Sequence, residues 1–271
     1  MKSRSNLLIL TECSIMIALS SVLSVFKLFE MPYGGSITLA SFLPIVVVAY
    51  RHGSRAGLSS ALCASLIQLL LGLKNFSYFT SWQSIVALAL FDYVFAFAIF
   101  GLAGIFKGII KKQNLSLVAG AVFSSVIRYA CHVISGATIW AGLSIPTEAA
   151  LIYSVSYNAT YMIPESIILV LTCAYLGSAL DLTRQVPTRL RSEKTDPVAS
   201  YLLCGAGFAI LGGLIADTVL IFSKLQNSDS GEFMITALSE VNWLAVGIIT
   251  VALLLVSVSL VTMAKRRINK L

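Results

Sequence analysis

Charged residues are scarce in this sequence. Asp, Glu, Lys and Arg make up only 11% of its 271 residues, whereas 58% are apolar and the mean hydropathy is +0.90. A soluble globular domain carries about 25% charged residues, so the composition excludes that class. The sequence therefore predicts an integral membrane protein.

Motifs for phosphate binding and catalysis are also missing. No segment reads GxxxxGK[ST], HExxH or GxSxG, so the chain has neither a P-loop for ATP nor the signature of a catalytic centre. Its five cysteines lie in apolar segments without CxxC or CxxH spacing, which favours buried hydrophobic residues over disulfides or metal ligands. We predict no enzyme activity, no metal and no cofactor. Any solute accumulation must draw on an ion gradient or a separate ATPase.

Long apolar runs recur along the chain, and most exceed the roughly 18 to 20 residues with which a helix crosses hydrocarbon. They predict eight helices, at residues 7–29, 37–50, 56–73, 84–106, 115–142, 149–176, 199–222 and 241–264. The second run is short and contains Pro44, so it is not expected to span as a plain rod. The preceding MPYGGS predicts either a re-entrant turn that lines a cavity or an ordinary loop.

The basic residues indicate the orientation in the membrane. Because loops rich in Lys and Arg stay in the cytoplasm, their concentration on alternate loops and both tails predicts cytoplasmic termini. The dispersed net charge of +7 is a topology signal and indicates no nucleic-acid partner. On the predicted cytoplasmic side are Lys2, Arg4, Arg51, Arg55, Lys107, Lys111, Lys112, Arg184, Arg189, Arg191, Lys194, Lys265, Arg266, Arg267 and Lys270; on the other are Lys27, Lys74 and Lys224.

A polar segment at 181–198 divides the chain. We expect residues 1–180 to form a six-helix functional unit and 181–198 a cytoplasmic linker. Residues 199–271 would add two transmembrane helices, for which the sequence suggests no role.

Three polar side chains fall at one depth in the predicted spans. At about 1.5 Å of rise per residue, Asp92 lies some 12 Å below the outer surface, and His132 and Asn158 lie some 15 Å below it. Their coincidence predicts a pocket open to the outside. The alternatives are a structural ion pair of Asp92 with Arg128 and a packed core histidine at 132.

Aromatic residues surround this level, at Trp82, Tyr93, Trp140, Tyr153, Tyr157 and Tyr161. A carboxylate beside aromatic faces suits a flat cationic ligand, through charge pairing and cation–π attraction of about 1 to 2 kcal/mol. Asparagine and histidine can then hydrogen-bond ring nitrogens and an amino group.

Four ordered segments resemble a known family. They read MPYGGSITLASFLPI (31–45), FDYVFAFAIFGLAG (91–104), RYACHVISGATIW (128–140) and IYSVSYNATYMIP (152–164). They are similar to segments of the thiamine-specific substrate-binding (S) component of energy-coupling factor (ECF) vitamin transporters. The resemblance implies an all-α, six-helix membrane core that captures thiamine from outside. It also implies delivery with a transmembrane coupling subunit and two cytoplasmic ATPases.

The resemblance also implies roles for single residues. Asp92 would pair with the ligand, His132 and Asn158 would hydrogen-bond it, and Trp140 would stack on a ring. Tyr93 would line the pocket and Tyr153 would contact the ligand. Since Tyr153 and Asn158 are about 140° apart on an ideal helix, both can face it only if the first turn is irregular or the ligand is wrapped.

The chain departs from the family pattern at several positions. It has Gly35 and Leu39 where some relatives have tryptophan and glutamate. The AxxxA pair with which the family docks on its coupling subunit reads Ser14-xxx-Ala18 here, and both residues are still small enough for close helix approach.

Three other functions stay open from the sequence. The chain could be an ion-coupled secondary transporter with Asp92 and Glu165 as proton carriers, or an S component for another vitamin. It could also be a membrane scaffold or sensor whose polar residues only join helices.

Overall fold

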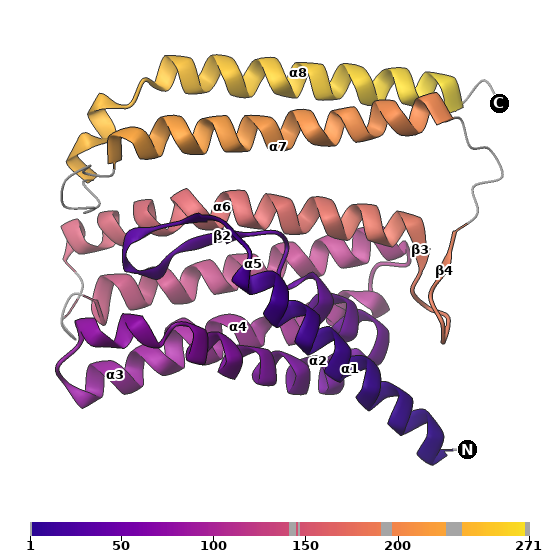
Figure 1. Cartoon of the computed structure of the whole chain (residues 1–271), viewed down its shortest axis with the longest axis horizontal. Coiled ribbons are helices and arrows are strands. Elements are labelled where there is room, and N and C mark those ends of the chain that lie inside the picture. The colour runs from indigo at the N-terminus through magenta and orange to yellow at the C-terminus, as the bar shows by residue number, and fades with distance from the viewer. Residues whose placement is uncertain (1, 141–144, 146, 191–196, 226–234, 269–271) are drawn as a thin grey trace. The chain divides into compact units, whose positions relative to one another are not determined.

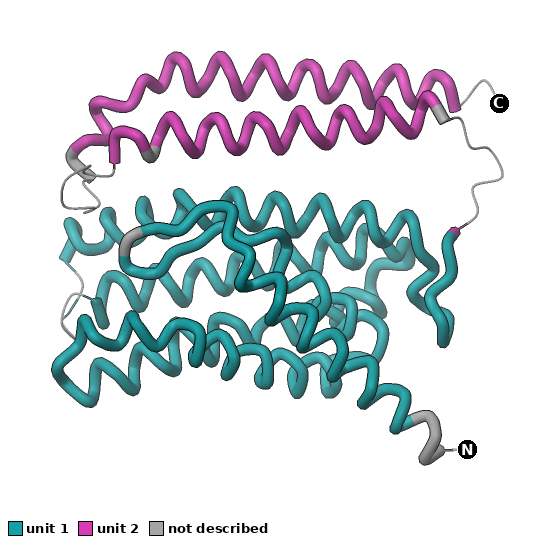
Figure 2. The backbone as a smooth tube through the Cα atoms, in the orientation of Figure 1, with its two compact units in different colours: residues 1–189 teal, residues 190–271 magenta. Residues whose placement is uncertain are grey.

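The computed structural model describes residues 2–140, 145, 147–190, 197–225 and 235–268. The chain divides into two compact units, residues 1–189 and 190–271 (Figure 2). Every long element in the described ranges is a helix, and the only sheets there are two short antiparallel hairpins. This confirms the predicted all-α membrane class.

The first unit is built from five long helical segments (Figure 1). Four of them are α1 (Lys2–Val25), α2 (Leu43–Leu71), α5 (Gln113–Thr138) and α6 (Glu148–Ala179). The fifth, residues 82–108, joins α3 (Trp82–Leu88), the π-helix η3 (Ala89–Phe95), α4 (Ala96–Ala98) and the 3-10 helix η4 (Ile99–Gly108). α5 and α6 pack side by side, and α1 lies obliquely across α2.

A β-hairpin connects α1 to α2. Its strands β1 (Lys27–Glu30) and β2 (Ser36–Thr38) pair antiparallel around the 3-10 turn η1 (Pro32–Gly34). The first helix therefore ends at Val25 and not near Phe29, because the next residues extend into a strand. The second begins at Leu43 and not at Ile37 for the same reason.

α2 folds back on itself at Gly53. Gly53 has φ 82° and ψ 176°. This backbone conformation lies outside the helical region, and glycine adopts it without a steric clash. In a straight helix Ala49 and Gly57 would be about 12 Å apart along the axis. Here the Cβ of Ala49 lies 2.8 Å from where a Cβ on Gly57 would stand. Residues 43–52 and 54–71 are therefore two packed helical arms.

Seven helices in the described ranges are long and apolar enough to cross a membrane, one fewer than the eight predicted. The second and third predicted helices are joined in α2, and the first arm spans only about 15 Å at helical rise. The six-plus-two arrangement is obtained only when the two arms are counted separately. Gly142, the predicted end of the fifth helix, lies outside the described residues.

Arg51 joins three segments at one end of the first unit. Its Nε and Nη2 donate to the Glu12 carboxylate on α1, and its Nη1 donates to the carbonyl of Leu182 at 2.7 Å and of Arg184 at 3.0 Å. Several donors of a buried guanidinium are thus satisfied together. The strands β3 (Leu180–Asp181) and β4 (Thr188–Arg189) belong to this unit, so the first half of the predicted linker is folded. Residues 191–196 of that linker lie outside the described residues.

The second unit is a pair of antiparallel helices, α7 (Pro197–Leu225) and α8 (Trp243–Ile268), with the short 3-10 helix η5 (Ile235–Glu240) before α8. Gly213 allows a close approach to Leu253. Thr250 donates a hydrogen bond of 2.6 Å to Asp217 across the pair. The two helices thus pack through small and polar residues.

Candidate functional site

The first unit encloses a cavity of about 620 Å³, a size typical of small-molecule sites. Helices form one part of its lining and the hairpin region forms another. All six residues predicted to bind the ligand line this cavity: Asp92, Tyr93, His132, Trp140, Tyr153 and Asn158.

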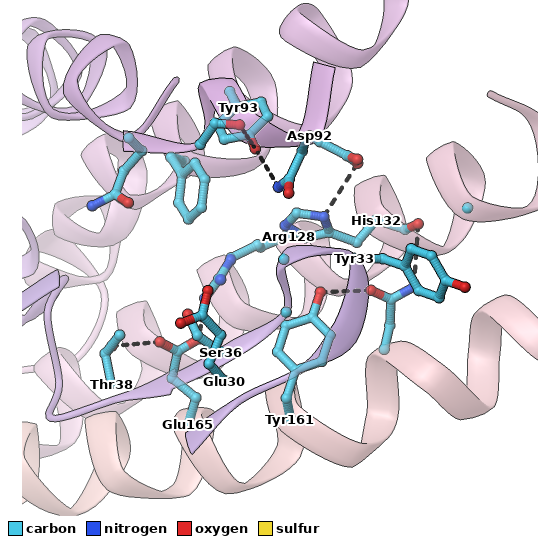
Figure 3. A pocket seen from close by; sticks show the side chains of 18 of the residues that line it. Glu30, Tyr33, Ser36, Thr38, Asp92, Tyr93, Arg128, His132, Tyr161 and Glu165 are labelled. Atoms are coloured by element: carbon cyan, nitrogen blue, oxygen red, sulfur yellow. Dashed lines mark hydrogen bonds and ion pairs between the residues drawn. The ribbon is translucent and has the colours of Figure 1, made fainter. Parts of the chain in front are cut away.

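Asp92 contacts two other residues of the predicted set, and Figure 3 shows its contact with His132. It is 9% exposed, and its carboxylate is 3.2 Å from Nδ1 of His132 and accepts a hydrogen bond of 3.0 Å from Nε1 of Trp140. The wider π-turn at Ala89–Phe95 lets both Asp92 and the next residue, Tyr93, line the cavity. The fourth and fifth predicted spans thus converge on one carboxylate.

The alternative of a structural pair between Asp92 and Arg128 is wrong. Arg128 donates from Nη1 to Glu165 on α6 at 2.5 Å, and Thr38 of β2 donates to the other oxygen of the same carboxylate at 2.5 Å (Figure 3). Arg128 also stacks over the ring of Phe97 at 4.7 Å. Glu165 therefore neutralises this arginine. Asp92 is left without a lysine or arginine partner among the described residues.

Asn158 ties α6 to α5. Its Nδ2 donates to the carbonyls of Ser154 at 2.9 Å and His132 at 3.3 Å, and its Oδ1 accepts from the hydroxyl of Tyr161 at 2.7 Å. Tyr153 lines the cavity as well, although α6 is a regular helix from Glu148. The cavity therefore borders a broad strip of α6. Tyr153 and Asn158 both line it although they are about 140° apart around the helix, and no irregular first turn is needed.

An aromatic cluster surrounds Trp140. Its ring centroid is 4.9 Å from that of Phe79, 5.8 Å from Tyr78 and 6.1 Å from Tyr33. Edge-on and tilted geometries of this kind are favoured for aromatic pairs. Flat apolar surfaces thus lie beside the Asp92 carboxylate.

The hairpin between α1 and α2 supplies a part of the lining that the helix pattern did not reveal. Tyr33 and Gly34 both have positive φ, 64° and 97°, and such a conformation is strained for tyrosine. Gly35 presses on the ring of Tyr161, and its N–H donates to the hydroxyl of Tyr157 at 3.4 Å. In the sequence, Pro32 and the paired glycines of MPYGGS indicated this turn, and the structure shows that it lines the cavity.

Charged residues occupy the more exposed part of the lining. Lys27, at 3.0 Å, and Lys74 both donate to the Glu30 carboxylate. Hydrogen bonds from Lys74 and then Lys27 hold the pKa of Glu30 below its usual range. This ion pair joins β1 to the turn after α2.

The predicted docking pair lies on the outer face of α1. Ser14 and Ala18 are exposed, and the Ser14 hydroxyl donates to the carbonyl of Leu10 at 2.9 Å within the helix. Large apolar side chains around them, such as Leu10 and Ile15, are exposed as well. The described residues of the first unit therefore leave this face of α1 uncovered, so another protein could contact it.

Residues 10–184 match the family model described as thiamine transporter protein (Thia_YuaJ). The chain belongs to this thiamine transporter family. The family consists of transport proteins and not of enzymes, and it is the one that the four sequence segments suggested. The match ends before α7 and α8, so the second unit lies outside the family's common part.

Individual thiamine transporters are also similar to this chain. The chain is 36% identical over 205 residues to the thiamine transporter ThiT of Bacillus subtilis. The matched region covers 72% of this chain and all of that relative. A solved structure of ThiT from Listeria monocytogenes matches with a TM-score of 0.51 at 23% identity, over 64% of this chain and 94% of the other. The structural match supports the membrane fold.

Proposed function

We propose that this chain is the substrate-binding membrane subunit of an ECF-type transporter and that it captures thiamine from outside the cell. The observation that carries the proposal is Asp92, a buried carboxylate on the cavity wall without a lysine or arginine partner among the described residues. An intramembrane carboxylate costs about 3 kcal/mol on insertion scales, so a cationic ligand would offset an existing cost. Thiamine carries a permanent positive charge on its thiazolium ring.

The remaining lining suits the rest of such a ligand. Trp140 offers a ring face for stacking, and Tyr93 and Tyr153 border the cavity. The Nε2 of His132 is buried and has no hydrogen-bond partner among the described residues, so a ligand amino group or ring nitrogen would complete it. Asn158 would hydrogen-bond the ligand after a local rearrangement, or it would support the site by holding α5 against α6.

Coupling to ATP hydrolysis would require other subunits, because the sequence contains no P-loop. We propose that α1 docks on a transmembrane coupling subunit through Ser14 and Ala18, and that two ATPases act on that subunit. Lys107 donates to the Arg51 carbonyl at 3.4 Å, so several basic residues gather at one end of the first unit. Their position supports cytoplasmic termini.

The rival function, a secondary transporter with proton carriers at Asp92 and Glu165, fits the geometry less well. Glu165 is held by an ion pair with Arg128 and a hydrogen bond from Thr38, so its carboxylate already joins α5, α6 and β2. Uptake into vesicles driven by a proton gradient alone would support this rival.

A fluorescence titration of the purified protein tests thiamine capture. Thiamine should quench tryptophan emission without ATP or an ion gradient, and Trp140→Ala should lose most of the quenching because Trp140 lines the cavity. Trp243→Phe, on the separate second unit, should keep it. Absence of quenching and of any binding heat would contradict the proposal.

A second variant tests docking separately from capture. Ser14→Leu should leave thiamine binding unchanged but prevent assembly with the coupling subunit, because a bulky side chain blocks close helix approach. A stable complex containing Ser14→Leu would refute the docking surface.

A further inference from the structure

Asn75 lies in η2 (Leu73–Tyr78), the 3-10 turn that follows α2. Its side chain is only 7% exposed, and it lines the cavity. The tip of the hairpin packs directly on it, because a Cβ on Gly34 would lie 2.1 Å from Nδ2 of Asn75. Asn75 is thus fixed between the hairpin and the ring of Tyr93.

The hydrogen bonds around Asn75 leave one acceptor without a donor. Its Nδ2 donates to the hydroxyl of Tyr93 at 2.9 Å, and that hydroxyl donates to the carbonyl of Gly72 at 3.2 Å. The Tyr93 proton is therefore used, and only a lone pair remains for a ligand. The Oδ1 of Asn75 is buried and has no hydrogen-bond partner among the described residues.

Asn158 differs from Asn75 in this respect. Oδ1 of Asn158 already accepts from Tyr161, and its Nδ2 already donates to backbone carbonyls. Buried polar groups in proteins are nearly always paired, so an unpaired amide oxygen in a residue that lines the cavity marks a place where a bound molecule supplies the donor. Of the two asparagines, Asn75 is the one that lacks such a partner.

We propose that Asn75 is a specificity-determining residue that contacts the ligand, and that its Oδ1 and the Tyr93 hydroxyl oxygen together accept a hydrogen bond from a ligand alcohol. The proposal rests on thiamine capture as proposed above. In thiamine, the primary alcohol sits on a two-carbon chain of the cationic ring. Tyr93 directly follows Asp92 in the sequence, and both line the cavity, so a ring cation and its alcohol would meet adjacent residues.

Calorimetric titration with two ligands tests the proposal. The probes are thiamine and its deoxy analogue, in which hydrogen replaces the hydroxyl group. The wild type should bind the analogue about tenfold more weakly, which is the usual worth of one buried hydrogen bond. Asn75→Leu should reduce this preference to about threefold, because Oδ1 is gone and only the Tyr93 hydroxyl oxygen remains as an acceptor. Asn6→Leu, on an exposed turn of α1, should keep the wild-type preference.

Tyr93→Phe separates direct contact from an effect through Tyr93. It removes the hydroxyl but leaves Oδ1 of Asn75, so it should retain about a threefold preference for thiamine. Equal affinity of the wild type for both probes, a full preference in Asn75→Leu, or complete loss in Tyr93→Phe would each overturn the role of Asn75. The wild-type and Tyr93→Phe titrations decide the matter even if Asn75→Leu does not fold. If thiamine itself fails to bind the wild type, thiamine capture fails first.

Discussion

The two walls of the cavity are built differently. The helical wall consists of side chains from residues 82–108, α5, the turn directly after α5, and α6. It contributes Asp92, His132 and, from that turn, Trp140. The loop wall consists of residues 27–42 and 72–79, with short strands, turns and positive φ angles at Tyr33 and Gly34. Buried charge comes from the helical wall, whereas the loop wall contributes backbone, Tyr33 and Asn75. The charged residues of the loop wall, Lys27, Glu30 and Lys74, lie at its exposed edge and pair with one another. We therefore expect changes in the helical wall to affect ligand charge recognition, and changes in the loop wall to affect closure and shape.

The largest effect is expected where the two walls meet, at Glu165. Glu165→Ala leaves the buried Arg128 unpaired and removes the acceptor of Thr38, so it should lower the free energy of unfolding by about 3 kcal/mol. Thermal unfolding in detergent measures the loss.

Replacing both charges distinguishes pairing from shape. The double variant Arg128→Met/Glu165→Met removes the ion pair but fills a similar volume, so it should recover most of the lost stability. A single variant as stable as the wild type would show that the walls are not joined through this carboxylate.

Asp92→Asn tests the charge of the helical wall. It keeps the shape of the side chain but removes its negative charge, so thiamine should bind at least about tenfold more weakly, or about 1.5 kcal/mol. Calorimetry provides the dissociation constant. Glu148→Gln, an exposed acid at the start of α6, is the matched control and should bind as the wild type does. An unchanged dissociation constant for Asp92→Asn would remove Asp92 from the site.

Gly34→Ala tests the shape of the loop wall. Gly34 has φ 97°, and a Cβ there would lie 2.1 Å from Asn75, so alanine should cost about 1 kcal/mol and weaken thiamine binding about fivefold. The dissociation rate, measured by stopped-flow fluorescence, should rise. Gly207→Ala is the control, because Gly207 lies within α7 and a Cβ there would stand in open space. Equal affinities for Gly34→Ala and the wild type would show that the hairpin tip does not shape the cavity.

The smallest effect is expected from pH at the exposed edge of the loop wall. Since Lys74 and Lys27 hold the pKa of Glu30 below its usual value, their contribution is present above the unfolded pKa and is lost as pH falls through the folded pKa. Thiamine should then dissociate at most about threefold faster in acid, because exposed ion pairs are weak. Glu30→Gln should not show this acceleration. The same acceleration in Glu30→Gln would assign it to another group.

The helical wall could be predicted from the sequence because helical rise converts residue number into depth. Asp92 and His132 were expected at a similar depth in the membrane, and in the structure Oδ1 of Asp92 lies 3.2 Å from Nδ1 of His132. The partner of Arg128 was not predictable in this way. Glu165 and Arg128 come from different helices, and the choice between Glu165 and Asp92 depends on how those helices rotate about their axes.

The loop wall was less predictable for a physical reason. Strand pairing and turns have no fixed rise along the membrane, so MPYGGS indicated a turn but not that Tyr33 would approach Trp140. The reversal at Gly53 depends on one glycine within an otherwise helical pattern. Asn75 had no signal, because its role depends on a hydrogen bond that is missing and not on a residue pattern.

The most direct test of the account is isothermal titration of the purified protein with thiamine, riboflavin and biotin. The account predicts saturable binding of one thiamine per chain and no heat of binding from the other two vitamins, since only thiamine offers a flat organic cation to Asp92. No binding of thiamine, or equal binding of riboflavin or biotin, would contradict it.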